Sequence, residues 1–375
     1  MLSSGRCPAP HAAGAGTTPA RQLKPAATLS AATTESQPAT TCGGIAAPLL
    51  ELSAEKGMLP TPTEPGPTKA VLLMAYGSPK NHEEILPYYT HMRGGRTPSP
   101  EALAELQARY AAIGGHSPLA EITIAQADGL RRALNSGEDR PWAVYVGMKH
   151  SHPFIEDAVR EMAEHGVKQA IGIVLAPHYS VMSIAEYLKR ASRTARETPG
   201  APQLTFVEDW HLHPGYISWL AGQVRAELAK LGKQRSQRAL TIFTAHSLPA
   251  RLREMGDPYP DQLGETAAAV AAELGLGNWT TGWQSMAQTA GEPWLGPDLL
   301  EVVRSEKAKG TSDFVVCACG FVADHLEVLF DLDVVAKREA SELGITIART
   351  AMPNADPQFL EVLSDLARNG FVEPS

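Results

Sequence analysis

Short apolar runs alternate with stretches of helical spacing from Lys69 to near the end of the chain. The runs are rich in β-branched residues, as expected for buried strands, and lie at 70–76, 142–148, 169–176, 204–207, 239–244, 314–317 and 345–348. Between them, apolar residues recur every three or four positions, as at Ile155, Val159 and Met162. This alternation predicts βαβ units, and therefore parallel sheets covered by helices on both faces.

The length of this region indicates more than one such sheet. A stretch of about 300 residues is long for a single doubly wound sheet. We therefore expect an α/β protein with two similar doubly wound, Rossmann-like domains, at 68–180 and 181–352. A C-terminal helix within 353–375 is expected to pack back on the first domain.

Residues 1–67 differ from the rest of the chain in composition. Ala, Gly, Pro, Ser and Thr make up most of this segment, and the first aromatic residue of the chain is Tyr76. Such a segment buries too little apolar surface to offset the entropy of ordering, so we expect a disordered tail. Its first half is basic and free of acidic residues, which resembles a transit peptide. A non-functional tail, or a true start at Met58, is the alternative that we favour.

Composition and charge exclude several classes of protein. The formal net charge of -8 argues against nucleic acid as the main partner. The longest clearly apolar run, 70–75, is far shorter than the roughly 20 residues of a membrane-spanning helix. Four cysteines, at Cys7, Cys42, Cys317 and Cys319, are too few for a disulfide scaffold. We therefore expect a soluble protein in the reducing cytoplasm.

Histidines follow three of the predicted strands, each close to a proline. They are His150, His178 and His246. One such histidine is more often a structural residue than a ligand. Because the carboxyl ends of parallel strands meet at one edge of a sheet, the three together favour a polar functional cleft at that edge.

Familiar catalytic motifs are absent from the sequence. It contains no Walker A motif, no complete G-x-G-x-x-G, no H-E-x-x-H, no C-x-x-C and no G-x-S-x-G. A nucleotide-binding protein, a zincin and an α/β-hydrolase therefore lack support. Ser247 follows His246, but adjacent strand residues point to opposite faces, which disfavours a Ser/His nucleophile.

Several stretches in the same order resemble the ferrochelatases, enzymes that insert Fe(II) into a porphyrin at the end of haem synthesis. The most specific is Ile-Phe-Thr-Ala-His-Ser-Leu-Pro at 242–249, followed by Gly-Asp-Pro-Tyr at 256–259. Supporting stretches lie at 73–77, 88–93, 109–118, 293–297 and 320–327. The resemblance implies a lyase-class metal chelatase with two doubly wound domains and the porphyrin cleft between them.

The resemblance assigns metal binding and catalysis to His246 and Glu327. Metallation removes two pyrrole protons and places one divalent ion, and an imidazole with its ordinary pKa of about 6.5 can serve as base and as ligand. Asp331 follows Glu327 by four residues, so both fall on one face of a helix and form an acidic line for protons or iron. Bacterial relatives often continue this line four residues on, where this chain has Val335.

Tyr76 bears on the choice of porphyrin. By resemblance, enzymes that use protoporphyrin carry Met at this place, whereas those of Gram-positive bacteria that use coproporphyrin III carry Tyr. Coproporphyrin III is therefore the expected substrate. Its four propionates need cations and hydrogen-bond donors, which by resemblance are Arg93, Arg109, Tyr110, Ser117 and Tyr187, with Arg96 and Lys149 nearby. Relatives often have a second arginine where this chain has Gly94, and Trp294 is either a macrocycle contact or a core residue.

Cofactors and partners follow from the same resemblance. Some related enzymes bind a [2Fe–2S] cluster, which needs four protein ligands, but only Cys317 and Cys319 lie in the part expected to fold. We expect no cofactor beyond the substrates Fe(II) and coproporphyrin III, and a monomer served by iron- or porphyrin-delivering proteins. A protoporphyrin ferrochelatase, a cobalt or nickel chelatase, and a porphyrin carrier without turnover remain alternatives. A base facing an acid disfavours the carrier.

Overall fold

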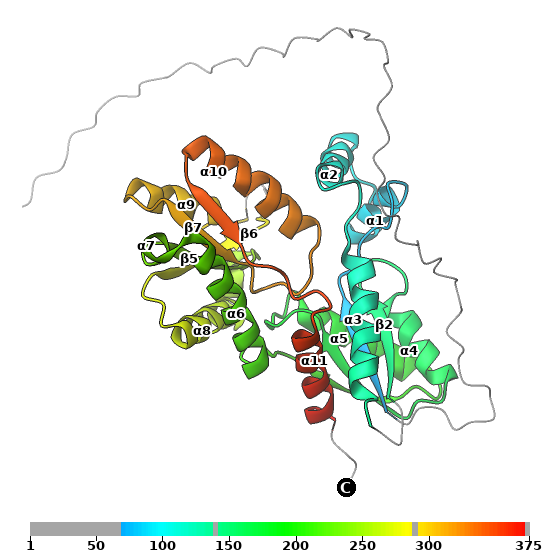
Figure 1. Ribbon diagram of the computed structural model, residues 1–375. Coiled ribbons are helices and arrows are strands. Elements are labelled where there is room, and N and C mark those ends of the chain that lie inside the picture. The colour runs from blue at the N-terminus through cyan, green and yellow to red at the C-terminus, as the bar shows by residue number, and fades with distance from the viewer. Residues whose placement is uncertain (1–68, 138–141, 287–291, 372–375) are drawn as a thin grey trace, which may run out of the picture. The chain divides into compact units, whose positions relative to one another are not determined.

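The computed structural model describes residues 69–137, 142–286 and 292–371 (Figure 1). The predicted tail at 1–67, with Cys7 and Cys42, lies outside these ranges. The described residues form two four-stranded sheets, and every pair of neighbouring strands is parallel.

The first sheet has the strand order β2-β1-β3-β4. Its strands are β1 (Lys69–Ala75), β2 (Trp142–Met148), β3 (Gln169–Val174) and β4 (Gln203–Val207). The helices that connect them are α1 (Ile85–Met92), α2 (Pro100–Ala112), α3 (Leu119–Leu134), α4 (Ile155–Glu164) and α5 (Ile184–Glu197).

The second sheet repeats this order as β6-β5-β7-β8. Its strands are β5 (Leu240–His246), β6 (Trp279–Gln284), β7 (Asp313–Cys317) and β8 (Thr346–Arg349). Its helical segments are α6 (Pro214–Leu231), α7 (Lys233–Ser236), η1 (Ala250–Leu252), α8 (Tyr259–Leu274), α9 (Leu299–Ala308), the π-helix η2 (Val328–Ala336), α10 (Lys337–Leu343) and α11 (Pro357–Asn369). The prediction of two similar parallel α/β sheets is confirmed.

Two details differ from the expectation. The boundary expected at residue 180 falls inside the first sheet, because β4 follows it and pairs with β3 from Gln203 to Val207. Strand β6 is not among the predicted strands. It is an edge strand of sequence Trp-Thr-Thr-Gly-Trp-Gln, and its polar and glycine positions hide it from a search for apolar runs.

The two faces of each sheet are covered by different helices. In β1, Ala70, Leu72 and Met74 pack with α4 and α5, whereas Val71 and Leu73 point to the opposite face. This is the period-two alternation of a strand buried on both sides. The same alternation divides β5 between a core shared with the first sheet and a core with α9.

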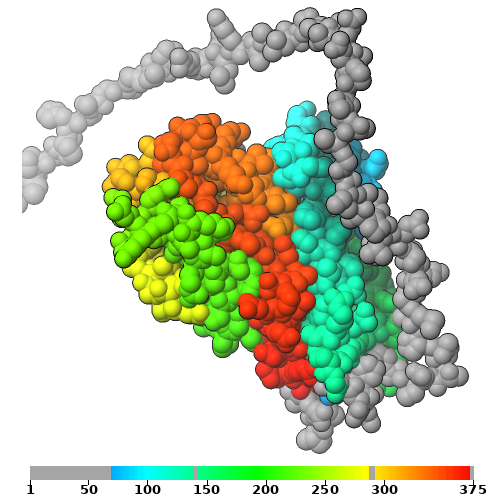
Figure 2. All heavy atoms as spheres, in the orientation of Figure 1, coloured from blue at the N-terminus to red at the C-terminus, as the bar shows by residue number. Residues whose placement is uncertain are grey.

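One hydrophobic core extends from the first sheet to the second. It contains Val71 and Leu73 of β1 and Phe243 of β5, with Leu130 of α3 and Leu363 of α11. Helix α11 contacts both α3 and α6, so the last helix joins elements of the two sheets (Figures 1 and 2). Within the ranges that the structure describes, no helix is both long and apolar enough to cross a membrane.

Candidate active site

The repeated strand order places Tyr76 and His246 at equivalent positions. Tyr76 directly follows β1, and His246 is the last residue of β5, which has the same place in the second sheet. In both sheets this strand is where the strand order reverses, which is the usual ligand position of doubly wound folds. The two residues that the sequence singles out thus lie at the switch points of the two sheets.

His246 and Glu327 form an ion pair. Nε2 of His246 lies 3.3 Å from Oε1 of Glu327, and Nδ1 of His246 contacts the carbonyl oxygen of Ser247. Because a carbonyl oxygen only accepts hydrogen bonds, Nδ1 carries a proton and Nε2 is the nitrogen that faces Glu327. The hydroxyl of Tyr259 donates to the carbonyl of His246 at 2.9 Å and fixes the end of β5.

The pair shifts the pKa of both of its members. Burial alone would lower the pKa of His246, but the charge and hydrogen bond of Glu327 outweigh it and raise this pKa to about 9. Burial would raise the pKa of Glu327, but His246 and His325 outweigh it and hold this pKa well below its usual range. The imidazole is therefore more basic than the ordinary histidine that the sequence analysis assumed.

Glu327 also contacts a second histidine, His325, which is not among the site residues predicted from the sequence. Nε2 of His325 lies 3.6 Å from Oε2 of Glu327, and its Nδ1 lies 3.0 Å from the carbonyl oxygen of Ala323. The only sequence signal for His325 is its place in the motif stretch at 320–327. Its position gives Glu327 one histidine on each carboxylate oxygen.

Asp331 lies on η2, which is a π-helix rather than the expected α-helix. The i→i+5 hydrogen bonds of a π-helix widen each turn, and such turns are frequent at functional sites. Asp331 accepts hydrogen bonds from the hydroxyl of Ser285 and, at 3.3 Å, from Arg109. Burial and then the charge of Glu327 raise the pKa of Asp331 despite these donors. Ser285, which sequence reasoning missed, has a left-handed φ of 60°.

Helix α2 carries two of the expected porphyrin contacts, Arg109 and Tyr110. The hydroxyl of Ser99 accepts from the backbone N–H of Ala102 and starts the helix, with Pro100 at its first position. The guanidinium of Arg109 lies 4.9 Å from the ring centre of Phe330, next to Asp331. Arg109 therefore contacts the second half of the molecule through both Phe330 and Asp331.

Tyr76 is 42% exposed although its neighbours in β1 are buried. Its ring centre lies 4.7 Å from that of His150. Burial and then the charge of Glu327 raise the pKa of Tyr76, and the same two causes raise that of Tyr110. The negative charge of Glu327 thus favours the neutral phenol in both tyrosines.

Lys149 directly precedes His150, whose ring lies beside that of Tyr76. The ammonium of Lys149 lies 5.2 Å from the ring centre of Tyr187, which is buried on α5. Trp294 lies near His246, with its ring centre 6.4 Å from that of His246.

Three predicted porphyrin contacts, Arg93, Arg96 and Ser117, interact with residues other than those of the His246–Glu327 pair. Arg93 is exposed at the end of α1 and lies 5.6 Å over the ring of Tyr89, and Arg96 donates only to the carbonyl of Arg93. Ser117 is buried, and its hydroxyl accepts from the N–H of Leu119 at the start of α3. Among the described residues, these contacts connect none of the three to His246 or Glu327.

The comparisons agree on one family. The ferrochelatase family model matches residues 68–370. The coproporphyrin III ferrochelatase of Anoxybacillus flavithermus is 46% identical over 301 residues, which cover 80% of this chain and 95% of that protein. The coproporphyrin III ferrochelatase of Oceanobacillus iheyensis is 46% identical over 298 residues, 79% of this chain and 95% of that protein.

A solved structure supports the fold alone. The protein DR2241 from Deinococcus radiodurans, described as a multi-domain protein with structural similarity to chelatases, has a TM-score of 0.52 at 13% identity and covers 82% of this chain and 56% of its own. The family match spans both sheets and every residue of the site described above. The chain therefore belongs to the ferrochelatase family.

Proposed function

We propose that this protein is a coproporphyrin III ferrochelatase. It inserts Fe(II) into coproporphyrin III, gives Fe-coproporphyrin III (coprohaem) and releases two protons, as a step of haem biosynthesis. The observation that carries the proposal is the pair of His246 and Glu327 at a switch point whose counterpart in the first sheet holds Tyr76. The names of relatives at 46% identity support the choice of substrate.

His246 and Glu327 have different roles in metal insertion. Nε2 of His246 binds Fe(II) or accepts a pyrrole proton once its own proton has left, since Nδ1 is occupied by the carbonyl of Ser247. Glu327 stays ionised, binds the ion from the other side and stabilises His246 when it is protonated. Both groups are needed because the ion must be held while two protons leave.

Asp331 serves as the next proton acceptor. Its raised pKa favours uptake of a proton closer to neutral pH than an ordinary aspartate allows. Ser285 and Arg109 hold its two oxygens, so the carboxyl is fixed while it changes its protonation state. The acidic line is short, because Val335 occupies the next position along η2.

The propionates of the porphyrin bind to cations and hydroxyls on the first half of the molecule. Arg109 and Lys149 supply the charge near the cluster, and Tyr110 and Tyr187 supply hydroxyls beside them. Arg93 and Arg96 are exposed and extend the positive charge outward, Ser117 shapes the start of α3, and Trp294 borders the macrocycle beside His246. Tyr76 directs its phenol toward the metal centre of the macrocycle.

Three further proposals concern cofactors, location and domains. Cys317 and Cys319 are buried free thiols, and the sulfur of Cys319 lies 3.7 Å from the carbonyl oxygen of Thr244, which supports a role in packing rather than in a cluster. A stoichiometric content of acid-labile sulfide in the purified protein would contradict this.

We propose that the protein is a monomer in the cytoplasm. Each sheet, with its helices, forms one chelatase domain.

Anaerobic turnover tests the function. Purified protein is mixed with Fe(II) and either coproporphyrin III or protoporphyrin IX, and the loss of free-base absorbance is followed. We expect turnover of coproporphyrin III, and loss of turnover with retained porphyrin binding in His246→Ala. Preference for protoporphyrin IX, or for Co(II) or Ni(II) over Fe(II), would support a related chelatase. Porphyrin binding without any turnover would support a carrier.

A further inference from the structure

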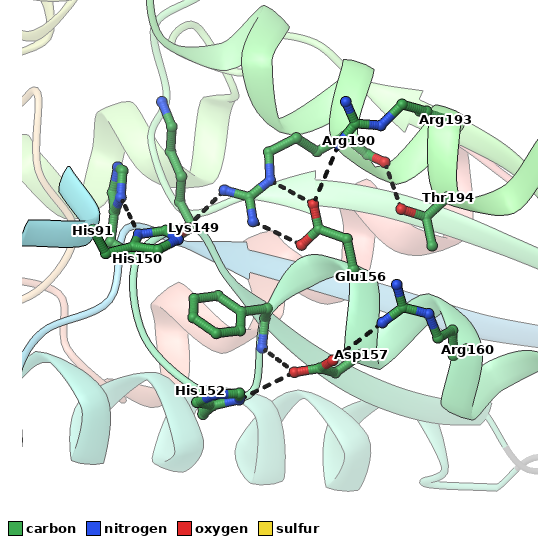
Figure 3. A network of polar contacts seen from close by, with 11 residues as sticks. His91, Lys149, His150, His152, Glu156, Asp157, Arg160, Arg190, Arg193 and Thr194 are labelled. Atoms are coloured by element: carbon green, nitrogen blue, oxygen red, sulfur yellow. Dashed lines mark hydrogen bonds and ion pairs between the residues drawn. The ribbon is translucent and has the colours of Figure 1, made fainter. Parts of the chain in front are cut away.

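Arg190 on α5 ties the segment after β2 to helix α4 (Figure 3). Its Nε and Nη2 donate to the two carboxylate oxygens of Glu156 at 2.8 and 2.7 Å, and its Nη1 donates to the carbonyl oxygen of Lys149 at 2.7 Å. The side chains of Arg190 and Glu156 are only 14% and 18% exposed. Such a bidentate fork fixes a guanidinium in orientation as well as in place.

Arg190 holds the peptide unit between Lys149 and His150, which makes one hydrogen bond through its C=O and another through its N–H. The carbonyl of Lys149 accepts from Arg190, and the N–H of His150, in the same peptide, donates to the carbonyl oxygen of Tyr76 at 2.9 Å. A peptide unit is planar and stiff, so holding its oxygen also sets the direction of its N–H. Glu156, Arg190 and this peptide thus form a continuous support that ends at Tyr76.

The same peptide joins Lys149, a proposed porphyrin contact, to His150, whose ring lies beside Tyr76. On one side of it, Lys149 extends over the ring of Tyr187 at 5.2 Å. On the other, the ring of His150 lies 4.7 Å from that of Tyr76, and its Nδ1 lies 3.1 Å from Nδ1 of His91. A turn of this peptide would move both Lys149 and His150. Its orientation therefore decides where a propionate meets Lys149 and how Tyr76 is supported.

Arg193 offers a natural comparison on the same helix. Its Nη2 lies 3.9 Å from Oε1 of Glu156, and its side chain is 53% exposed (Figure 3). Arg193 therefore shares the carboxylate with Arg190, but the carbonyl of Lys149 is bonded by Arg190. Arg193 therefore provides a control for a cation that lies near Glu156 without bonding the carbonyl of Lys149.

We propose that Arg190, held by Glu156, is a positioning residue that fixes the Lys149–His150 peptide and thereby the Tyr76 side of the porphyrin site. This inference rests on the proposed function. It adds two residues that never touch the reacting atoms. Their effect reaches the porphyrin through a backbone carbonyl.

The first test compares Arg190→Lys with Arg193→Gln in the full-length protein. Lysine keeps the charge but loses the fork that serves Glu156 and Lys149 together. We expect the KM for coproporphyrin III to rise about tenfold in Arg190→Lys, as for the loss of a hydrogen bond from a charged donor, with little change in kcat. Arg193→Gln should match the wild type. An unchanged porphyrin KM in a folded Arg190→Lys protein would overturn the proposal.

A charge swap separates positioning from stability. The double variant Arg190→Glu with Glu156→Arg restores opposite charges between α5 and α4, but a carboxylate at 190 cannot donate to the carbonyl of Lys149. We expect its Tm to recover relative to Arg190→Glu alone while the porphyrin KM stays high. Recovery of both would overturn the proposal, because the ion pair alone would then suffice.

Hydrogen exchange gives a readout that does not depend on turnover. We expect the amide of His150 to exchange about tenfold faster in Arg190→Lys than in the wild type or in Arg193→Gln, since its bond to Tyr76 loosens. Should Arg190→Lys not fold, Glu156→Gln provides the same readouts. If the wild type fails to metallate coproporphyrin III, the proposed function fails, while His150 exchange still tests the positioning. Unchanged exchange would overturn the positioning itself.

Discussion

The guanidinium of Arg109 on α2 lies 3.3 Å from the carboxylate of Asp331 on η2, so one ion pair connects the first half of the molecule to the acidic residues of the second. A porphyrin propionate that binds Arg109 competes directly with Asp331. Loss of this cation would raise the pKa of Asp331 further, since Arg109 is among the groups that lower it. Substrate binding would thus prepare Asp331 to take up a proton.

Asp331→Asn should lower kcat without weakening porphyrin binding. The amide oxygen can still accept from Arg109, but the side chain can no longer take up the proton that His246 passes on. We expect kcat to fall about 10²-fold, the usual size of a lost acid–base group, with no rise in the KM for coproporphyrin III, since a neutral amide competes less for Arg109. Steady-state kinetics would check this against Asp128→Asn, an exposed aspartate on α3. An unaltered kcat would remove Asp331 from the proton path.

Metal affinity should rise with pH. Because Glu327 outweighs burial and raises the pKa of His246 to about 9, a metal ion must displace the Nε2 proton at neutral pH. Affinity for Co(II), a divalent probe, should therefore increase about tenfold for each pH unit below 9 and level off above it. In Glu327→Gln, the pH above which the affinity for Co(II) stays constant should fall toward the ordinary histidine pKa. Absorption titrations of Co(II) would measure both, and a pH-independent affinity would contradict the ion pair.

The same pair should stabilise the protein in a defined pH window. The raised pKa of His246 contributes stability below its ordinary value of 6.5 and loses it as the pH rises through about 9. The lowered pKa of Glu327 contributes above its ordinary value of 4.5 and loses it as the pH falls. The Tm difference between the wild type and Glu327→Gln should be largest between these two ordinary values. Calorimetry would test this, with a constant difference across pH as the contrary result.

Tyr76→Met should shift the choice of porphyrin. The change removes a ring supported by His150 and, on the proposed function, the hydroxyl that would face the metal centre. We expect the ratio of kcat/KM for coproporphyrin III to that for protoporphyrin IX to fall about tenfold, within the range that a single pocket contact supplies. Tyr76→Phe keeps the ring and should preserve most of the preference. Equal ratios in the wild type and the Met variant would separate Tyr76 from substrate choice.

Gly77→Ala should destabilise the protein. Gly77 has a left-handed φ of 89°, and a Cβ there would lie 2.4 Å from the hydroxyl oxygen of Ser151. Strain and clash together should lower the free energy of unfolding by ~1–3 kcal/mol. Gly222→Ala on α6, where a Cβ would meet nothing within 4 Å, should instead raise it by ~0.5–1 kcal/mol. Urea denaturation would measure the free energy of unfolding of both variants. Equal changes in the two would contradict the explanation from backbone strain and steric clash at Gly77.

Sequence patterns predict elements where local periodicity and burial agree. The expected strand at 142–148 has the bounds of β2, and the strand of His246 was expected at 239–244 against Leu240–His246 in the structure. Both strands are apolar on two faces, so their signal is continuous. Strand β6 was not predicted because its sequence, Trp-Thr-Thr-Gly-Trp-Gln, contains no apolar run, whereas β2 is apolar although it is also an edge strand.

Residues of the proposed site could be predicted from the sequence only where they belong to a motif of the family. His246 and Glu327 lie together in space although 81 positions separate them in sequence, and the resemblance alone linked them before the structure. His325 and Ser285 have no periodicity of their own, because their positions depend on the turn after β7 and the end of β6. The π-helical form of η2 was also hidden, since its nearly continuous apolar sequence fits either kind of turn.

Helix α11 crosses from the end of the second sheet to lie between α3 and α6, with Phe359 and Leu363 fully buried. The first half of the chain does not complete its core by itself, because it is covered by α11, a helix that follows the second sheet in the sequence. Folding of the two halves is therefore expected to be cooperative, with a single melting transition. The first half, once synthesised, therefore keeps this apolar face uncovered until α11 has also been made.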